Sequence, residues 1–220
     1  GLLPHQVARE VLGARPGAVL SGPTFAREVG AGLPTAMTVA SKDQRFAKEL
    51  ALMLSGPTFR AYTQNDIMGV EVGGAVKNVI AIGSGIADGM GFGANTRVAL
   101  IARGLKEMMR LGVRLGAVRE TFMGLAGLGD LVLTCTDDQS RNRRFGMALA
   151  RGQSVHDAQS AIAQVVEGVP AADAVHTVAR RLDVDMPICG EIYRVMHEDK
   201  PVRDAVQALM ARELRSETED

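Results

Sequence analysis

The stretch over residues 69–97, GVEVGGAVKNVIAIGSGIADGMGFGANTR, decides how the rest of the chain is interpreted. From residue 72 to residue 82 its only polar side chains are those of Lys77 and Asn78. As a helix, this stretch would place Gly73 one turn before Lys77 and further small residues after it. A face so nearly bare would let a small substrate lie against the backbone and meet the amine. The alternative is a lysine that snorkels out of an ordinary core helix, and composition alone does not decide between the two.

A glycine pattern in the same stretch imitates a dinucleotide-binding loop. Gly83, Gly85 and Gly89 give G-x-G-x-x-x-G directly after the apolar run VIAI. The dinucleotide fingerprint needs a helix that begins inside the glycine run, so that its N-terminus faces the pyrophosphate. Here no apolar periodicity resumes until after Asn95. The pattern therefore favours a glycine-rich turn that lets the backbone approach Lys77.

The hydrophobic periodicity divides the chain near residue 65. The expected elements are, in order, helix 3–12, strand 18–20, strand 35–40, helix 43–54, strand 58–62 and helices near 95–111, 117–124, 130–135, 141–151, 154–166, 170–182, 188–198 and 202–214. Alternating strands and helix predict a βαβ layer over residues 1–65, whose opening part is absent. An all-helical domain is expected over residues 66–220. The helix over 43–54 is expected to bury Phe46, Leu50, Met53 and Leu54.

Composition narrows the class of protein. Of the 220 residues, 46% are hydrophobic and 23% are charged, which is ordinary for a globular protein. Lys plus Arg equals Asp plus Glu at 25 each, so no nucleic acid and no anionic membrane is expected as a partner. No apolar run reaches transmembrane length. Cys135 and Cys189 lie far apart and the histidines show no ligand spacing, so the sequence favours a cytoplasmic protein with no disulfide framework and no metal site.

The segment QSRNRRFG, residues 139–146, is a candidate phosphate site. Ser140 is a good N-cap, and the cations of the following residues would occupy the first turn of a helix, where they oppose the helix dipole. They make sense if an anion binds at that end, because free N–H groups, an arginine fork and the Asn142 amide suit a phosphate. A solvated basic turn is the alternative, and this segment alone does not choose between them.

The segment AGLGDLVLTCT, residues 126–136, supplies a carboxylate. Asp130 follows a glycine turn, and Thr134 comes one helical turn later. Asp130 could accept a hydrogen bond from the Lys77 amine or from a substrate hydroxyl, although this segment alone favours simple N-capping. Glu167, in VVEG, needs no function between two helices. Together, the amine, the carboxylate and the phosphate seat suit proton transfer to or from oxygen on a small phosphorylated substrate.

Six motifs in order carry a family resemblance: SGPTFA, GGAVKNVIAIG, GFGAN, AGLGDLVLTCT, QSRNRRFG and VVEG. They resemble bacterial NAD(P)-dependent sn-glycerol-3-phosphate dehydrogenases, over the later two thirds of that family's chain. The resemblance implies an α/β remnant of a Rossmann-type domain over residues 1–65. An all-α domain with a fold like the C-terminal domain of 6-phosphogluconate dehydrogenase would follow over residues 66–220. The Rossmann fingerprint would be missing, so this chain alone is expected to be an incomplete, inactive fragment.

The resemblance also implies an activity, the interconversion of dihydroxyacetone phosphate and sn-glycerol 3-phosphate with NAD or NADP, which supplies phospholipid synthesis. Lys77 would be the general acid/base. The implied residues are Lys77, Asn78, Asp130 and Thr134 for catalysis; Gly22, Thr24, Lys77, Asp130, Ser140, Arg141 and Asn142 for substrate; and Ala26, Arg141, Val165 and Glu167 for cofactor. No metal is implied, and a homodimer is left open. The competing hypotheses are a non-catalytic helical interaction module and a related hydroxyacid dehydrogenase.

Overall fold

The computed structural model describes residues 1–162, 164–213 and 216–217. Its contacts divide the chain into two compact units. Gly1–Gly74 and Gly112–Leu133 form the first, here called the α/β unit, and Ala75–Leu111 and Thr134–Asp220 form the second, called the helical unit. Each unit is built from two separate stretches of chain, because the long helices of the middle region pass from one unit into the other.

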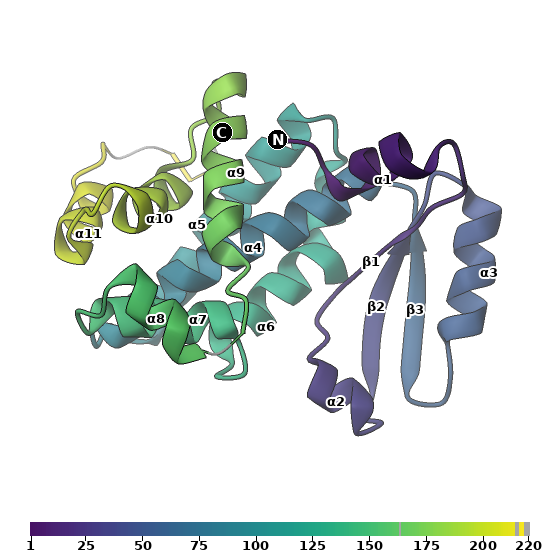
Figure 1. The fold of residues 1–220 in the computed structure, drawn as a ribbon, viewed down its shortest axis with the longest axis horizontal. Coiled ribbons are helices and arrows are strands. Elements are labelled where there is room, and N and C mark those ends of the chain that lie inside the picture. The colour runs from purple at the N-terminus through teal and green to yellow at the C-terminus, as the bar shows by residue number, and fades with distance from the viewer. Residues whose placement is uncertain (163, 214–215, 218–220) are drawn as a thin grey trace. The chain divides into compact units, whose positions relative to one another are not determined.

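The α/β unit contains a three-stranded sheet in the order β1-β2-β3 (Figure 1). The strands are β1 (Val19–Ser21), β2 (Thr35–Ala40) and β3 (Phe59–Gln64), and helix α3 (Gln44–Leu54) joins the last two. β2 and β3 are parallel, with Thr35 opposite Phe59, whereas β1 runs antiparallel to β2. The predicted βαβ layer is confirmed, with strand bounds within two residues of those expected.

The buried face of α3 differs from the one predicted. Ala47 and Ala51 are buried and pack with Val39 of β2, whereas the Met53 side chain is 81% exposed. Phe46 and Leu50 are only half-buried, and Leu54 is exposed. The prediction gave weight to the largest apolar side chains. A helix that lies close against a short sheet instead turns its smallest residues inward, so the real face is rotated toward the two alanines.

The α/β unit also contains the start of α4 (Ile67–Gly89) and four shorter helical elements. They are the helices α1 (Pro4–Leu12) and α2 (Ala26–Gly30), the 3₁₀-helix η1 (Arg119–Met123) and the π-helical turn η2 (Leu125–Gly129). The buried Asp66 accepts hydrogen bonds from the N–H groups of Gly69 and Val118, each at 2.9 Å, and from the Thr121 hydroxyl at 2.7 Å. This carboxylate fixes the first turn of α4 against η1.

Among the described residues, the helical unit contains the rest of α4, most of α5, the last residues of α6 and the helices from α7 to α11. The α-helices after α4 are α5 (Ala94–Arg114), α6 (Asp130–Thr136), α7 (Arg141–Ala150), α8 (Val155–Ile162), α9 (Gly168–Leu182), α10 (Pro187–His197) and α11 (Val202–Met210) (Figure 1). The helices predicted downstream of residue 65 are present with shifted ends, except that residues 119–123 form a 3₁₀-helix. Residues 163 and 214, which two of the predicted helices include, lie outside the described residues. No strand occurs among the described residues beyond Gln64. Asn95 lies inside the first turn of α5.

The predicted glycine-rich turn after residue 82 is wrong. α4 continues as one helix of 23 residues to Gly89, so Gly83 and Gly85 lie inside it, and neither a turn nor a dinucleotide loop is present there. A Cβ at Gly83 would lie 2.8 Å from Cδ1 of Ile192, and a Cβ at Gly85 only 1.9 Å from the Arg143 carbonyl oxygen. These glycines therefore allow other helices to approach α4 closely.

Among the described residues, α4 is long and apolar enough to cross a membrane by length and composition alone, which the prediction of no such run had missed. However, 78% of its most apolar window is buried inside the protein. Val79, Ile80 and Ile82 are completely buried. A helix that is apolar on all sides and enclosed by its own protein is a core helix.

Candidate active site

α4 carries the two polar residues that the sequence placed at the centre of the site. Lys77 is half-buried, and Asn78 is 6% exposed. The Asn78 side chain forms hydrogen bonds within the helical unit: its Oδ1 accepts a hydrogen bond of 2.9 Å from Nδ2 of Asn142, and its Nδ2 donates to Oε2 of Glu167 at 3.3 Å. Asn78 therefore joins α4 to α7 and to the segment that precedes α9.

The first turn of α7 has the structure predicted from QSRNRRFG. The Ser140 hydroxyl accepts a hydrogen bond from the Arg143 N–H at 3.2 Å, which is N-cap geometry. Asn142 is buried, and its Oδ1 accepts a hydrogen bond of 2.8 Å from the Gly168 N–H. Since Nδ2 of Asn142 donates to Asn78, this one amide links α7 to both α4 and the first residue of α9.

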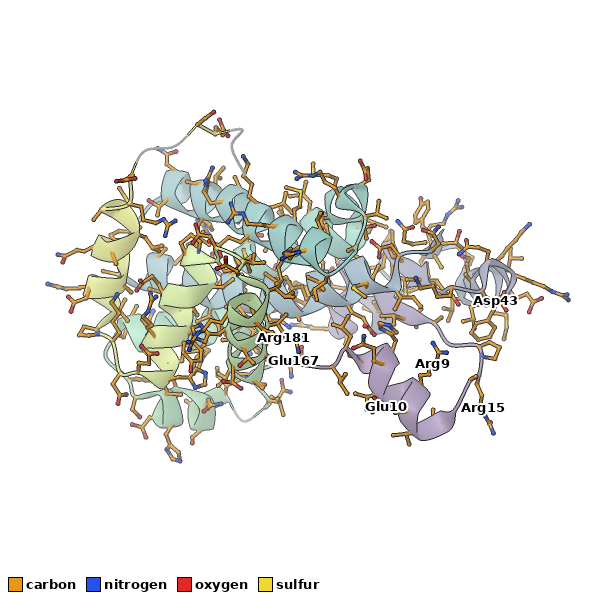
Figure 2. All side chains as sticks on the ribbon, turned by 90° about the horizontal axis from the view of Figure 1, so that it is seen from above. Arg9, Glu10, Arg15, Asp43, Glu167 and Arg181 are labelled. Atoms are coloured by element: carbon orange, nitrogen blue, oxygen red, sulfur yellow. The ribbon has the colours of Figure 1, made fainter. Side chains whose placement is uncertain are left out.

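Glu167 meets two of the groups proposed for ligand binding. Its side chain is 58% exposed, and Figure 2 labels it beside α9. Its Oε1 lies 3.5 Å from Nη2 of Arg141, and its Oε2 accepts the hydrogen bond from Asn78. One carboxylate thus bridges a guanidinium from α7 and an amide from α4. Val165, two residues earlier, is 70% exposed.

α6 places two further groups near α4. Thr134 is 7% exposed, and Cys135 is completely buried. Burial raises the pKa of the Cys135 thiol to about 12, while the cations of Arg143 and Lys77 act in the opposite direction. Lys77 therefore lies within electrostatic range of α6. The Cys135 carbonyl also accepts a hydrogen bond of 2.8 Å from the Ser84 hydroxyl of α4.

In the α/β unit, the predicted substrate residues follow β1. Gly22 has a φ of 150°, and a Cβ there would lie 3.0 Å from Cα of Met37, so this position favours glycine. The Thr24 hydroxyl donates a hydrogen bond of 3.1 Å to the Gly22 carbonyl, and Ala26 begins α2. The loop after β1 is thus a close-packed turn that holds Thr24 in place.

Asp130 is 3% exposed and belongs to the same unit. The hydroxyl of Ser21, the last residue of β1, donates to its Oδ2 at 3.5 Å. Asp130 has helical backbone angles (φ −71°, ψ −34°) as the first residue of α6, which is not N-cap geometry. Simple N-capping, which its segment favoured, is therefore wrong. The sequence prediction missed Ser21, although it is the first residue of the motif SGPTFA.

The predicted site residues therefore form two sets. The helical unit holds Lys77, Asn78, Thr134, Ser140, Arg141, Asn142, Val165 and Glu167, and the α/β unit holds Gly22, Thr24, Ala26 and Asp130. Hydrogen bonds and an ion pair connect Asn78, Asn142, Arg141 and Glu167 within the helical unit. The pairing of Lys77 with Asp130 stays a prediction.

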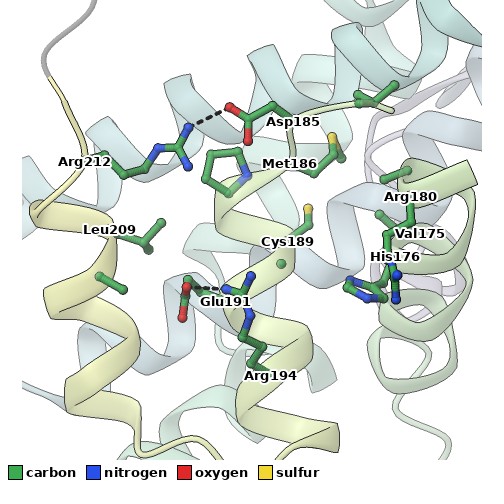
Figure 3. Close-up of a pocket in the computed structure, with 15 residues that line it drawn as sticks. Val175, His176, Arg180, Asp185, Met186, Cys189, Glu191, Arg194, Leu209 and Arg212 are labelled. Carbon is green, nitrogen blue, oxygen red and sulfur yellow. Dashed lines mark hydrogen bonds and ion pairs between the residues drawn. The ribbon is translucent and has the colours of Figure 1, made fainter. Parts of the chain in front are cut away.

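A separate cavity of about 250 Å³ lies among α9, α10 and α11 of the helical unit (Figure 3). Arg212 pairs with Asp185 at 2.6 Å, and Arg194 pairs with Glu191. None of the predicted site residues lines this cavity. This cavity is therefore distinct from the network around Asn78.

Comparison with known proteins decides the family. Residues 66–207 match the profile described as NAD-dependent glycerol-3-phosphate dehydrogenase C-terminus, and residues 1–47 match the corresponding N-terminus profile. The chain belongs to the NAD-dependent glycerol-3-phosphate dehydrogenase family. The family and the fold class predicted from the sequence, an α/β remnant followed by an all-helical domain, are thereby confirmed.

Relatives within the glycerol-3-phosphate dehydrogenase family are similar over nearly the whole chain. Glycerol-3-phosphate dehydrogenase (NAD(P)+) of Tolumonas auensis is 56% identical over 219 residues, which cover 99% of this chain and 66% of the relative. The protein of the same name from Aeromonas hydrophila is 58% identical with the same coverage. The crystal structure of glycerol-3-phosphate dehydrogenase from Coxiella burnetii is 50% identical, with a TM-score of 0.93 over 96% of this chain and 65% of that one. The chain thus spans about two thirds of the length of its relatives.

Proposed function

We propose that the intact protein reduces dihydroxyacetone phosphate to sn-glycerol 3-phosphate with NADH or NADPH, and also catalyses the reverse oxidation. One observation carries the proposal: the hydrogen bond between Asn78 and Asn142 sets the helix that bears Lys77 beside the helix that begins with Ser140 and Arg141. A proton donor and an anion-binding helix start are thereby built on neighbouring helices. Relatives that are 56% and 58% identical to this chain over 219 aligned residues are named for this activity.

Lys77 is the proposed general acid/base. In reduction its ammonium donates a proton to the substrate carbonyl oxygen, and in oxidation the neutral amine accepts the proton of the hydroxyl. The bound nicotinamide cofactor would supply or accept the hydride. Asn78, Asp130 and Thr134 are proposed to orient Lys77 and the substrate oxygens. The burial of these three side chains supports that role, since a buried polar group holds a fixed geometry once it is satisfied.

The substrate phosphate is proposed to bind at the start of α7. Ser140, Arg141 and Asn142 lie in the N-cap and first turn, where the backbone N–H groups of a helix start and the helix dipole favour an anion. Arg141 is half-buried and can present two parallel N–H groups to phosphate oxygens. Gly22 and Thr24 of the α/β unit are proposed to contact the substrate as well.

The residues proposed for the cofactor fit part of a dinucleotide. Glu167 offers an exposed carboxylate, which can accept hydrogen bonds from ribose hydroxyls, and Arg141 beside it can serve a phosphate of either ligand. Val165 and Ala26 complete the proposed contacts. These residues do not distinguish NAD from NADP, and both are proposed as cofactors.

We further propose that the functional domains divide near residue 65, with residues 1–65 in the cofactor-binding domain and residues 66–220 in the substrate-binding and catalytic domain. The proposed location is the cytoplasm, where the product would supply phospholipid synthesis. The equal numbers of acidic and basic residues support a small-molecule substrate rather than nucleic acid or a membrane as the partner. A homodimer is the proposed assembly.

The decisive experiment measures NADH and NADPH oxidation by the intact protein with dihydroxyacetone phosphate. Lys77→Ala should lower kcat by about 10²–10⁴-fold, the usual contribution of general acid/base catalysis. Lys106→Ala is the matched control, because Lys106 is also a half-buried lysine of the helical unit and lies outside the proposed site. Equal kcat values for the two variants would show that Lys77 is not the acid/base.

A binding experiment separates the competing hypotheses. Isothermal titration should show that dihydroxyacetone phosphate binds and that dihydroxyacetone, which lacks the phosphate, binds far more weakly. Equal affinity would favour a different hydroxyacid dehydrogenase. If dihydroxyacetone phosphate binds but is reduced with neither NADH nor NADPH, a non-catalytic module is favoured.

A further inference from the structure

A buried ion-pair network holds the first turn of α7 from behind. The Arg143 side chain is only 8% exposed, and its Nε and Nη2 donate to Oδ2 of Asp88 at 2.9 and 2.7 Å. Its Nη1 pairs with Asp138, in the loop before α7. Asp88, at the C-terminal end of α4, is 10% exposed and also lies 3.5 Å from Nη1 of Arg97.

This network lies beside a direct backbone contact between α4 and α7. A Cβ at Gly85 would meet the Arg143 carbonyl oxygen at 1.9 Å, and a Cβ at Gly146 would meet the Ile82 carbonyl oxygen at 2.0 Å. A shift of α7 along α4 would break the hydrogen bonds of Arg143 to Asp88, so this network helps to hold α7 in place on α4. The hydrogen bond between Asn78 and Asn142 lies on the same interface.

Arg143 is therefore not available as a ligand for an anion, although the sequence places it in the basic turn. Its guanidinium points back to two carboxylates instead of outward from the helix start. A cation in the first turn is disfavoured by the helix dipole unless an acid compensates for it. Asp88 and Asp138 supply that compensation for Arg143, so Arg141 rather than Arg143 is the arginine proposed to meet the substrate.

We infer that Asp88 is a positioning residue of the proposed dehydrogenase: by holding Arg143, it sets Arg141 and Asn142 at the right place relative to Lys77 and Asn78. This inference rests on the proposed function. Asp88 touches neither substrate nor reacting atoms in this scheme. Asp88 acts on the proposed phosphate-binding residues at the start of α7. Lys77 belongs to α4 and keeps its position when α7 moves.

The test compares substrates with and without a phosphate. In the intact protein, Asp88→Asn should raise KM for dihydroxyacetone phosphate by about ten-fold or more, because misplacement of a binding group by an ångström is costly. The kcat value should change far less. The kcat/KM for dihydroxyacetone should be unchanged, because that substrate has no phosphate to place. Inorganic phosphate, as a competitive inhibitor, should lose affinity by the same factor as the phosphorylated substrate.

Glu191→Gln is the matched control for general loss of stability. Glu191 is the centre of another buried ion-pair network in the helical unit, with Arg194 and Lys200, and its side chain is 9% exposed. This variant should lose stability without separating the two substrates. If Asp88→Asn does not fold, Arg143→Lys tests the same link, because lysine keeps the charge and loses the two-nitrogen contact.

The outcomes of this test separate failure of the positioning role from failure of the proposed function. An equal loss for both substrates, or no loss for either, would overturn the positioning role. If the wild-type protein reduces dihydroxyacetone phosphate with neither cofactor, the proposed function fails instead. In that case, titration of the wild-type protein and Asp88→Asn with inorganic phosphate still tests the placement of the anion seat, and equal affinities would overturn the inference.

Discussion

Gly146→Ala tests the contact on which the proposed site depends. Gly146 lies inside α7, and a Cβ there would lie 2.0 Å from the Ile82 carbonyl oxygen and 2.9 Å from the Ile86 nitrogen. Both are backbone atoms of α4, so no side chain can rotate away. Ordinary contact begins near 3.4 Å, so the two helices must separate by more than an ångström along that direction.

The expected change in the free energy of unfolding follows from two opposing contributions. Alanine is better than glycine inside a helix by about 1 kcal/mol. Overpacking typically costs about 1–3 kcal/mol, and a clash between backbone atoms belongs at the upper end. We expect a net loss of about 1–2 kcal/mol in the free energy of unfolding. Because Asn142 moves away from Asn78 with the helix, kcat/KM for dihydroxyacetone phosphate should fall by about 10–100-fold.

Urea denaturation and steady-state turnover of the intact protein measure both effects, and Gly190→Ala is the control. Gly190 lies inside α10, where a Cβ would meet no atom within 4 Å. The same substitution there should stabilise the protein by about 0.5–1 kcal/mol and leave turnover unchanged. If Gly146→Ala were as stable and as active as Gly190→Ala, the close approach of α7 to α4 would be wrong.

Three further predictions concern Arg141, Glu167 and Glu107. Arg141→Ala should mainly raise KM for dihydroxyacetone phosphate in steady-state assays, and an unchanged KM would remove the phosphate seat. Glu167→Gln should tighten the binding of inorganic phosphate by at most about five-fold in a titration, since an exposed ion pair contributes about 0–1 kcal/mol; weaker binding would show that Glu167 does not compete for Arg141. Burial raises the pKa of Glu107 from 4.5 to about 7. The N–H groups at the start of α10 donate hydrogen bonds to its carboxylate and lower the pKa, but burial has the larger effect. The contribution of Glu107 to stability is therefore present below pH 4.5 and lost as the pH rises toward 7, so the free energy of unfolding relative to Glu107→Gln should fall over that range, and a constant difference would contradict the assignment.

The order of strands and helices could be predicted from the sequence because each depends on local periodicity. The strands at 35–40 and 58–62, the helix between them and the cap of α7 at Ser140 follow from neighbours a few residues apart. The buried face of α3 could not be predicted in the same way. Ala47 and Ala51 face inward because α3 packs close to the sheet, and the distance between helix and sheet is not encoded in the local sequence pattern.

The glycines of α4 show a second limit of the sequence. A glycine in a turn and a glycine under a neighbouring helix both need the absence of a side chain, for different reasons. At Gly85 the reason is the Arg143 carbonyl oxygen, 58 residues later in the chain. An apolar run that ends in several glycines therefore predicts equally well a strand with a loop, a turn, or a helix crossed by another helix. Only the partner of each glycine decides, and the partner is known only from the fold.

The basic first turn of α7 contains two arginines with different carboxylate partners. The helix dipole requires anions near these cations, and the sequence supports a phosphate for that reason. The structure supplies carboxylates instead: Asp88 and Asp138 pair with Arg143, and Glu167 pairs with Arg141. The two sets differ in strength. The pair of Arg143 with Asp88 is buried, at 2.7 Å, whereas Arg141 and Glu167 are 3.5 Å apart and partly exposed.

This difference separates a structural arginine from a binding arginine. To displace a buried partner, a ligand would have to leave a buried charge unpaired, which is strongly unfavourable. To displace Glu167 from Arg141 costs at most about 1 kcal/mol, which a doubly charged phosphate with bidentate hydrogen bonds exceeds. Arg141 is thus the position at which we propose that an anion enters. Under the proposed function, Oε1 of Glu167 would then accept a hydrogen bond from the ribose of the cofactor, while Oε2 keeps its hydrogen bond from Asn78. Binding of the two ligands should therefore be coupled through this single carboxylate.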